Sequence, residues 1–325
     1  MPGNSAPVLI LSAHFAERYG DELAAAAPDA AIVRHDTDGR WDGDPDTGTI
    51  GLMSSDMWAT GMAPRVLEQF AEMKSLRWLQ TSSAGVDRPV YARLLARGVI
   101  LTNRGSHNSI PVAQHVLALM LARARRLSEY RELQAERLWK RLAADELTEA
   151  TVLIVGLGDI GREVARLCRV FGMRVLGMRR RAAPDPLLDE VLPADRLREV
   201  LPRADYVVLA CPLTEATRGL IDAGALAAMK PTAYLINVAR GPVVDAQALA
   251  AALHAGCIGG AALDVFTPEP LPADSPLWSV PNLTITPHGA ASSPLGPERG
   301  ARNFLDNLAR YVRGESLQNL VLSVE

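Results

Sequence analysis

Short apolar runs alternate with helical patterns along most of the chain. Residues 152–155 form a continuous apolar run of strand length, and an amphipathic segment at 160–171 follows it. A strand that is apolar on both faces is typical of a parallel sheet covered by helices on both sides. Further strand candidates lie at 174–177, 206–210, 234–238, 261–265 and 284–286. This alternation predicts an α/β fold with a doubly wound parallel sheet.

The first hundred residues repeat this pattern more weakly. Strands are predicted at 8–11, 49–53 and 76–80, and helices at 16–27 and 66–73. A long helix is predicted from Ile110, with Pro111 in its first turn. After Pro294 the chain is again helical, with Phe304 and Leu308 on one apolar face. A terminal helix of this kind can return to the first domain and make that domain discontinuous.

Length and composition narrow the class of protein. The 325 residues suit two domains of ordinary size. A net charge of -3 disfavours a partner that is nucleic acid or an anionic membrane, and no apolar run is long enough to cross a bilayer. Cys168, Cys211 and Cys257 lack metal-ligand spacing, so we expect buried free thiols and no metal site. Residues 1–12 lack the features of a secretory signal, and we therefore expect a cytoplasmic protein.

A glycine pattern follows the run at 152–155. Gly156, Gly158 and Gly161 have the spacing of a dinucleotide-binding loop, with Asp159 and Ile160 between them. The first glycine permits a tight turn, the second a close approach of the pyrophosphate, and the third the packing of helix on strand. The helix that begins here directs its positive end at the phosphates. Because a strand precedes the loop and a helix follows it, we predict a dinucleotide site.

The end of the next strand bears on the choice of cofactor. An acid about 20 residues after the loop usually accepts the ribose hydroxyls of NAD. Here Arg179, Arg180 and Arg181 occupy that region and no acid is present. A guanidinium binds a 2′-phosphate with two parallel hydrogen bonds, so NADP(H) is favoured and NAD(H) remains the alternative. The competing interpretation is that the three arginines only solvate a loop.

Three later strands each end near a polar residue that can act in chemistry. Arg240 follows the strand at 234–238, Asp264 and Glu269 lie at and beyond the end of the strand at 261–265, and His288 follows the strand at 284–286. Open α/β sheets bind their ligands at this edge. A lone histidine is more often structural, and His115 and the other histidines keep that interpretation. His288 differs because it ends a strand beside a glycine.

With these segments taken together, the sequence closely resembles the D-isomer-specific 2-hydroxyacid dehydrogenases over nearly its whole length. The resemblance rests on the loop at 84–87, the glycine loop, the stretch at 211–217 and the Arg240, Asp264–Glu269 and His288 segments in the family's order. Within the family it is most similar to the glyoxylate/hydroxypyruvate reductases. The implied fold is two Rossmann-like domains with parallel sheets, the cofactor domain being inserted into a discontinuous substrate domain.

The resemblance assigns roles to the polar residues. His288 is implied as the general acid–base that protonates the carbonyl oxygen, and Glu269 as the partner that orients the imidazole and favours its protonated form. Arg240 is implied to bind the substrate carboxylate and polarise the carbonyl. The backbone amides around Ala84, Gly85 and Val86 are implied to bind the same carboxylate.

The resemblance also extends the cofactor site beyond the glycine loop. Asp264 is implied to contact the nicotinamide carboxamide. The other residues assigned to the cofactor are Pro212, Thr217, Val238, Ala239, His288 and Gly289.

Domain boundaries and assembly follow from the same resemblance. We expect a substrate domain at 1–103 and 292–325 and a dinucleotide-binding domain at 104–291. The charged stretch 123–149 has a broken apolar stripe, which fits either a solvated helix or an arm that docks on a second subunit. The resemblance favours the arm, and hence a homodimer.

The expected activity is the NAD(P)H-dependent reduction of a small 2-oxo acid, such as glyoxylate, hydroxypyruvate or pyruvate, to the D-2-hydroxy acid. The alternative is a dinucleotide-sensing corepressor without physiological turnover, because the fold also serves that purpose. In the first domain, Ser54, Ser55, Met57 and Trp58 follow a strand and are candidates for lining the substrate pocket, although helix packing also explains Met57 and Trp58.

Overall fold

The computed structural model describes residues 6–83, 85–86, 88–103, 105–181 and 183–321, without the side chains of Ser106 and His107. The chain forms two compact units. Unit 1 consists of Met1–Asn108 and Ser293–Glu325, and unit 2 is Ser109–Ser292. The boundaries expected from the sequence, 103/104 and 291/292, differ from these by a few residues.

Unit 1 is built on a five-stranded parallel sheet in the order β2-β1-β3-β4-β5. Its strands are β1 (Val8–Ser12), β2 (Ala31–His35), β3 (Ile50–Met53), β4 (Trp78–Thr81) and β5 (Ile100–Thr102). Its helices are α1 (Ala13–Arg18), α2 (Gly20–Ala26), α3 (Ser55–Ala59), α4 (Ala63–Glu72), α5 (Pro89–Ala96) and α12 (Gly296–Val312), with the 3₁₀ helices η1 (Pro45–Thr47) and η2 (Gly105–Asn108).

The structure corrects one expectation for unit 1 and adds elements that were not predicted, among them α3 and α5. The predicted helix at 16–27 is two short helices, α1 and α2, because Tyr19 breaks the helical backbone with φ -118° and ψ 26°. The strands β2 and β5 were not predicted. Both show little alternation, since β2 carries Arg34 and His35 in its last two positions and β5 has only three residues.

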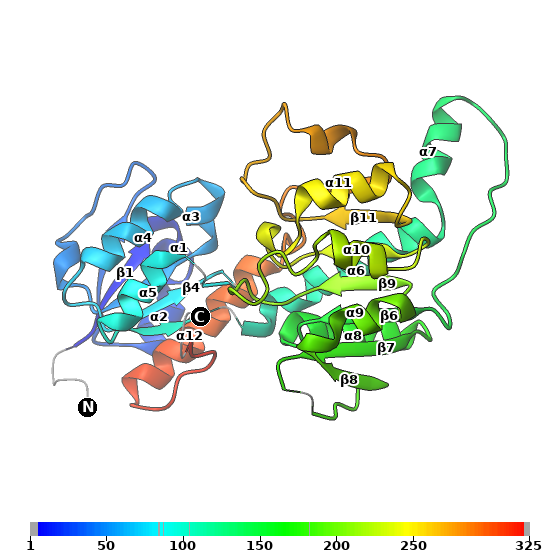
Figure 1. Cartoon of the computed structure of the whole chain (residues 1–325). Coiled ribbons are helices and arrows are strands. Elements are labelled where there is room, and N and C mark those ends of the chain that lie inside the picture. The colour runs from blue at the N-terminus through cyan, green and yellow to red at the C-terminus, as the bar shows by residue number, and fades with distance from the viewer. Residues whose placement is uncertain (1–5, 84, 87, 104, 182, 322–325) are drawn as a thin grey trace. The chain divides into compact units, whose positions relative to one another are not determined.

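The C-terminal helix α12 completes unit 1, where it lies beside α2 (Figure 1). Phe304 is fully buried and stacks on Trp78 of β4 with ring centroids 5.5 Å apart. Polar contacts add to this packing, because the Gln80 amide donates to Asn303 (3.1 Å) and accepts from Asn307 (3.0 Å). All three of these side chains are buried, so the network satisfies groups that would otherwise cost free energy to bury.

Unit 2 contains a seven-stranded parallel sheet in the order β12-β11-β10-β9-β6-β7-β8. Its strands are β6 (Thr151–Val155), β7 (Arg174–Arg179), β8 (Glu190–Pro193), β9 (Tyr206–Leu209), β10 (Tyr234–Asn237), β11 (Gly260–Leu263) and β12 (Leu283–Ile285). Its helices are α6 (Ser109–Ala124), α7 (Leu127–Ala135), α8 (Asp159–Val170), α9 (Leu197–Val200), α10 (Ala223–Ala228) and α11 (Ala246–His254), with the 3₁₀ helices η3 (Ala194–Arg196), η4 (Leu201–Arg203), η5 (Gly241–Val243) and η6 (Pro276–Ser279).

The strand order confirms the predicted doubly wound α/β class. The central strand β6 pairs with β7 on one side and with β9 on the other. The direction of winding therefore changes between β6 and β9, and a crevice for ligands is expected at the carboxyl ends of these strands. The edge strand β8 was not predicted from the sequence.

The segment after α6 stands away from the sheet of unit 2. Figure 1 shows α7 and the stretch that follows it extending from the rest of the unit. The predicted helical pattern continues only to Ala135 in this region. Leu127, Leu138 and Trp139 expose 52%, 54% and 102% of their surface, so this arm presents large apolar side chains to solvent.

The described residues contain no helix that is both long and apolar enough to cross a membrane. Cys168 and Cys211 are buried free thiols as predicted, whereas the expectation for Cys257 was wrong because it is exposed. Cys257 lies just after α11, directly behind the turn at Gly256, which has φ +66°. Burial raises the pKa of the Cys168 thiol to about 12 and that of the Cys211 thiol to about 11.

Candidate active site

The glycine loop joins β6 to α8 at the centre of the unit 2 sheet. Gly156 has φ +98°, and its amide donates to the Met178 carbonyl of the neighbouring strand β7 at 2.9 Å. A Cβ atom at this position would lie 2.6 Å from the backbone of Cys211, which follows β9. Only glycine fits this turn, both because of its φ and because three strands meet there.

The other two glycines differ in their surroundings. A Cβ atom at Gly161 would overlap the carbonyl oxygen of Gly156, so this glycine allows α8 to pack directly against the loop. By contrast, no described atom lies within 4 Å of a Cβ built at Gly158. The space beside Gly158 is therefore open where α8 begins, with Asp159 in its first turn. This space, at the positive end of a helix, suits a phosphate group.

Arg179 is the last residue of β7 and lies next to the glycine loop along the sheet edge. Met178 pairs with Val155 in the parallel ladder, so Arg179 and Gly156 follow paired positions. Its guanidinium donates to the Ala183 carbonyl. The Nε atom is buried and has no hydrogen-bond partner among the described residues. A buried donor without an acceptor is costly, and an anionic ligand would satisfy it.

Arg180 and Arg181 follow on the exposed side of the same turn. The stretch after β9 is the next segment along the edge. There the Thr217 hydroxyl donates to the Pro212 carbonyl at 2.7 Å and accepts from the Thr214 amide at 2.7 Å. Thr217 therefore closes its own loop.

Arg240 follows β10, and the buried side chain of Asn237, the last residue of that strand, fixes the loop that carries Arg240. The buried side chain of Asn237 donates to the Arg240 carbonyl at 3.0 Å and accepts from the Ala239 amide at 3.0 Å. Gly241 packs so closely on Phe266 that a Cβ atom would overlap its backbone. The Arg240 loop is thereby set against the segment that follows β11. Val238 and Ala239 are buried in the same turn.

Asp264 follows β11 and organises the turn after β12. Its side chain is 3% exposed. Oδ1 accepts from the Thr286 hydroxyl at 2.6 Å and the Gly289 amide at 2.9 Å, and Oδ2 accepts from the Ala290 amide at 3.0 Å. The Asp264 carbonyl also accepts from the His288 amide at 2.8 Å. The buried carboxylate thus fixes the backbone on both sides of His288.

The imidazole of His288 is paired with a carboxylate. His288 has φ +51°, a conformation that non-glycine residues adopt rarely and that the Asp264 contacts support. Its Nδ1 lies 2.8 Å from Oε2 of Glu269, while Oε1 of Glu269 accepts from the Phe266 amide at 2.8 Å. The His288 side chain is 53% exposed. Nδ1 is thus engaged and Nε2 is the ring nitrogen left to meet a substrate.

His115, on α6, also belongs to this network. The sequence predicted the helix but not this role for the histidine. Its Nε2 lies 3.2 Å from the Thr286 hydroxyl oxygen. A threonine hydroxyl has one proton, and the short contact to Asp264 uses it, so we infer that His115 donates to Thr286. The resulting chain runs from His115 through Thr286 to Asp264. Only the helical spacing of His115 was readable in the sequence, and that spacing indicates packing.

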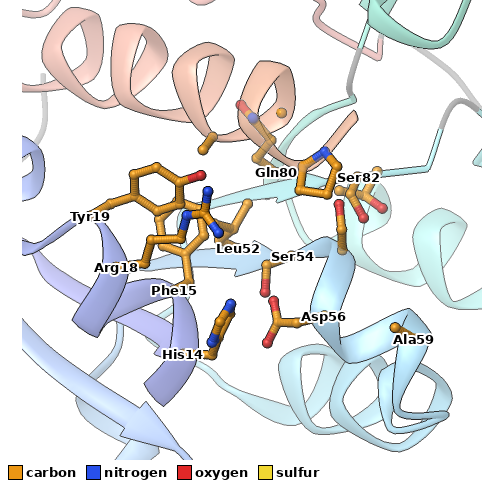
Figure 2. Close-up of a pocket in the computed structure, with 15 residues that line it drawn as sticks. His14, Phe15, Arg18, Tyr19, Leu52, Ser54, Asp56, Ala59, Gln80 and Ser82 are labelled. Carbon is orange, nitrogen blue, oxygen red and sulfur yellow. The ribbon is translucent and has the colours of Figure 1, made fainter. Parts of the chain in front are cut away.

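In unit 1, the predicted carboxylate-binding loop follows β4. Gly85 and Val86 are half-buried, whereas Ala84 lies outside the described residues. The neighbouring candidates divide into two pairs. Ser54 and Ser55 line a cavity, which Figure 2 shows. Met57 is buried in the core and Trp58 packs under the Arg88 guanidinium, 5.2 Å from ring centroid to Cζ, and neither lines this cavity, which favours helix packing for these two.

The carboxyl edge of the unit 2 sheet therefore carries two groups of functional residues. One end offers a glycine turn, open space at a helix start and an arginine. The other end offers an imidazole–carboxylate pair and Arg240. An oriented imidazole can transfer a proton, and a guanidinium can hold a carboxylate and polarise an adjacent carbonyl. No group of three or more metal-ligating side chains occurs in the part of the chain that the structure describes.

Comparison with protein families gives a match to unit 2. Residues 117–290 match "D-isomer specific 2-hydroxyacid dehydrogenase, NAD binding domain". The match covers more than half of the chain and falls within unit 2.

Two curated relatives carry different activities in their names. A glyoxylate reductase of Korarchaeum cryptofilum is 37% identical over 263 residues, which are 78% of each protein. A D-3-phosphoglycerate dehydrogenase of Mycobacterium leprae is 32% identical over 320 residues, 97% of this chain and 58% of that protein. The chain thus spans little more than half the length of this second relative.

Among solved structures, an NADPH-dependent glyoxylate/hydroxypyruvate reductase of Sinorhizobium meliloti in complex with NADP and sulfate is similar over the whole chain. The TM-score is 0.76 and the identity 26%, and the alignment covers 98% of both chains.

Proposed function

The chain belongs to the D-isomer specific 2-hydroxyacid dehydrogenase family, and on that premise we propose that it reduces a small 2-oxo acid to the D-2-hydroxy acid with NADPH. Family membership makes it an NAD(P)-dependent dehydrogenase. The substrate class proposed here is glyoxylate, hydroxypyruvate or a similar acid. The observation that carries the proposal is the 2.8 Å contact between His288 and Glu269, on the same sheet edge as the glycine loop.

The chain's own residues would handle the proton and the substrate charge. His288 donates the proton from Nε2 to the carbonyl oxygen, while Glu269 holds Nδ1 and so orients the ring. Arg240 binds the carboxylate and polarises the carbonyl beside it. The amides of Gly85 and Val86 are the proposed further donors to the carboxylate. When bound, the reduced nicotinamide supplies the hydride.

The glycine loop and Arg179 fit a dinucleotide with a 2′-phosphate. The open space at Gly158 accommodates a pyrophosphate against the start of α8. The buried Nε of Arg179 lacks an acceptor among the described residues, and Arg180 and Arg181 lie on the same turn. These observations support NADPH over NADH, as does the NADP in the S. meliloti reductase. Asp264 retains one acceptor position, on Oδ2, for the nicotinamide carboxamide. Pro212, Thr217, Val238, Ala239 and Gly289 are proposed to lie along the cofactor.

We propose a homodimer formed through the arm at 123–149. Trp139 is fully exposed and Leu138 more than half exposed, and burying them against a second copy would remove apolar surface from water. Light scattering should give the mass of a dimer for the wild type. A Trp139→Asp variant is expected to shift that mass towards a monomer, and an unchanged mass would argue against the arm.

We also propose a cytoplasmic location. Cys168 and Cys211 remain free thiols in the structure, which suits a reducing compartment.

A steady-state screen tests the activity directly. Glyoxylate, hydroxypyruvate and pyruvate are each assayed with NADPH and with NADH, following oxidation of the cofactor. We expect turnover with at least one acid and a higher kcat/KM with NADPH. Binding of NADPH without turnover on any of the acids would favour the alternative, a dinucleotide-sensing corepressor.

A further inference from the structure

Unit 1 contains a cavity of about 230 Å³ at the carboxyl edge of its sheet. Its walls come from α1, from the end of β3 and the following helix α3, from the end of β4 and from the start of α12 (Figure 2). A water molecule occupies about 30 Å³ in the liquid, so the cavity has room for several. The single carbon that hydroxypyruvate adds to glyoxylate would fill only part of it.

Part of the polar lining forms a cluster at one side of the cavity. Figure 2 shows the side chains of His14, Ser54 and Asp56 directed toward one another from α1, the end of β3 and the start of α3. Neither the His14 ring nor the Asp56 carboxylate makes a hydrogen bond or ion pair within the described ranges. The Ser54 hydroxyl lies 3.3 Å from that of Ser12. The His14 ring and the Asp56 carboxylate are therefore available to a ligand, whereas the Ser54 hydroxyl is shared with Ser12.

The charge of the lining favours an uncharged ligand group. Asp56 presents an anion to the cavity, and a phosphate or carboxylate there would be repelled. Arg18 also lines the cavity, but its guanidinium lies 3.9 Å from Glu298 and 5.5 Å from the Tyr19 ring centroid. The positive charge of Arg18 is thus partly offset by Glu298. A carboxylate, an imidazole and serine hydroxyls together suit alcohol groups, which both donate and accept hydrogen bonds.

The cavity adjoins the loop proposed to bind the substrate carboxylate. Ser82 lines it and lies in the same loop as Gly85 and Val86. The Ser82 amide donates to the Met53 carbonyl at 3.0 Å, which ties this loop to the end of β3. A substrate held at Gly85 and Val86 would therefore direct its remaining chain toward Ser54 and Asp56.

We infer that this cavity binds the polyhydroxylated chain of a 2-oxo acid longer than hydroxypyruvate, with Asp56 accepting hydrogen bonds from its hydroxyl groups. The inference rests on the proposed function, and it names a substrate class for that site. It disfavours a phosphorylated acid of the kind that phosphoglycerate dehydrogenases handle.

The test compares kcat/KM for 2-oxogluconate, for 2-oxohexanoate of equal chain length, and for 3-phosphohydroxypyruvate, each with saturating NADPH. The hydroxylated acid should exceed the alkyl acid about tenfold or more, as expected for hydrogen bonds to a charged group. Equal values for these two acids, or a preference for the phosphorylated acid, would overturn the inference. This comparison uses the wild-type protein and does not depend on any variant folding.

An Asp56→Asn variant assigns the effect to the cavity. The ratio of kcat/KM for 2-oxogluconate over 2-oxohexanoate should fall about tenfold, because a neutral amide replaces the anionic acceptor. Asp21→Asn is the matched control, since it removes an exposed carboxylate in the first turn of α2, outside the cavity. The control should keep the wild-type ratio. An unchanged ratio in Asp56→Asn would contradict the assignment.

A binding measurement separates this inference from the proposed function. D-Gluconate, which cannot be reduced at C2, is titrated calorimetrically into the wild type and Asp56→Asn. If no 2-oxo acid is reduced, the proposed function fails, and gluconate binding that weakens in Asp56→Asn would still support the cavity. If glyoxylate is reduced but gluconate neither binds nor competes, the inference on the cavity fails alone.

Discussion

The two ends of the unit 2 sheet edge work by different means. At the β6–β7 end the decisive feature is space, because Gly156 and Gly161 admit no Cβ atom and Gly158 faces open volume. At the β10–β12 end the decisive feature is the fixing of side chains, because Asn237, Asp264 and Glu269 hold the segments that carry Arg240 and His288. The first end is therefore sensitive to added atoms and the second to lost functional groups. Substitutions at the two ends should separate binding from chemistry.

The largest expected effect is that of His288→Ala at the β10–β12 end. Loss of the general acid should lower kcat by about 10²–10⁴-fold. The dissociation constant for NADPH should stay near the wild-type value, because the glycine loop is untouched. Stopped-flow rates and a fluorescence titration give the two quantities. Loss of NADPH binding would mean that the two ends are not separable.

Arg240→Ala removes the proposed carboxylate clamp at the same end. A guanidinium that holds a charged group contributes about 1.5–3 kcal/mol per hydrogen bond, so kcat/KM should fall by about 10²-fold. We expect KM for the oxo acid to rise and kcat to fall together. Unchanged kinetics would exclude Arg240 from the substrate site.

At the β6–β7 end, Gly156→Ala and Gly158→Ala form a matched pair. Gly156→Ala forces a side chain into a left-handed turn against the Cys211 backbone, and should lower the free energy of unfolding by about 1–3 kcal/mol. Gly158→Ala meets no protein atom and should leave the free energy of unfolding unchanged while weakening NADPH binding. Denaturant titrations and dissociation constants test both. Equal stability of the two variants would contradict the steric account.

Arg179→Asp tests, at the same end of the sheet, whether this arginine binds the 2′-phosphate of the cofactor. The substitution replaces a cation by an anion, and we expect the ratio of kcat/KM for NADPH over NADH to fall about tenfold or more. Lys74→Asp makes the same charge change at an exposed position of unit 1 and should keep the ratio. If Arg179→Asp also keeps it, this arginine does not bind the 2′-phosphate.

The smallest effect concerns Cys211, beside the glycine turn. Burial raises the pKa of its thiol to about 11 and that of Cys168 to about 12, so both remain protonated at pH 8. Iodoacetamide at pH 8 should label the exposed Cys257 and spare these two, without affecting activity. Mass spectrometry of peptides reads the result. Rapid labelling of Cys211 would mean that the glycine turn opens readily.

The sequence predicted those parts of the fold that depend on local patterns. The apolar runs of β6, β9 and β10 and the helix α8 were readable because the strands are almost continuously apolar and the helix is clearly periodic. The strands β2, β5 and β8 were not, since they lie at sheet edges and mix polar with apolar residues. Such edge strands form by hydrogen bonding to one neighbouring strand, and their own sequences do not show the apolar pattern that reveals a central strand.

The candidate site divides in the same way. Arg240, Glu269 and His288 were predicted from their places beyond strand ends and from the family resemblance, and the structure places Glu269 2.8 Å from His288. The contributions of His115 and Thr286 could not be found, because their 3.2 Å contact joins residues far apart in the sequence. The cavity of His14 and Asp56 was missed for the same reason, whereas Ser54 was named from its place after β3.

The transfer of hydride to a 2-oxo acid is the central claim, and isotope labelling tests it most directly. The wild type is incubated with glyoxylate and NADPH that carries deuterium at both C4 positions, and the glycolate formed is analysed by mass spectrometry. We predict glycolate with one deuterium on C2 and a hydroxyl proton from solvent. Unlabelled glycolate, or NADPH that is bound but not consumed, would contradict the account.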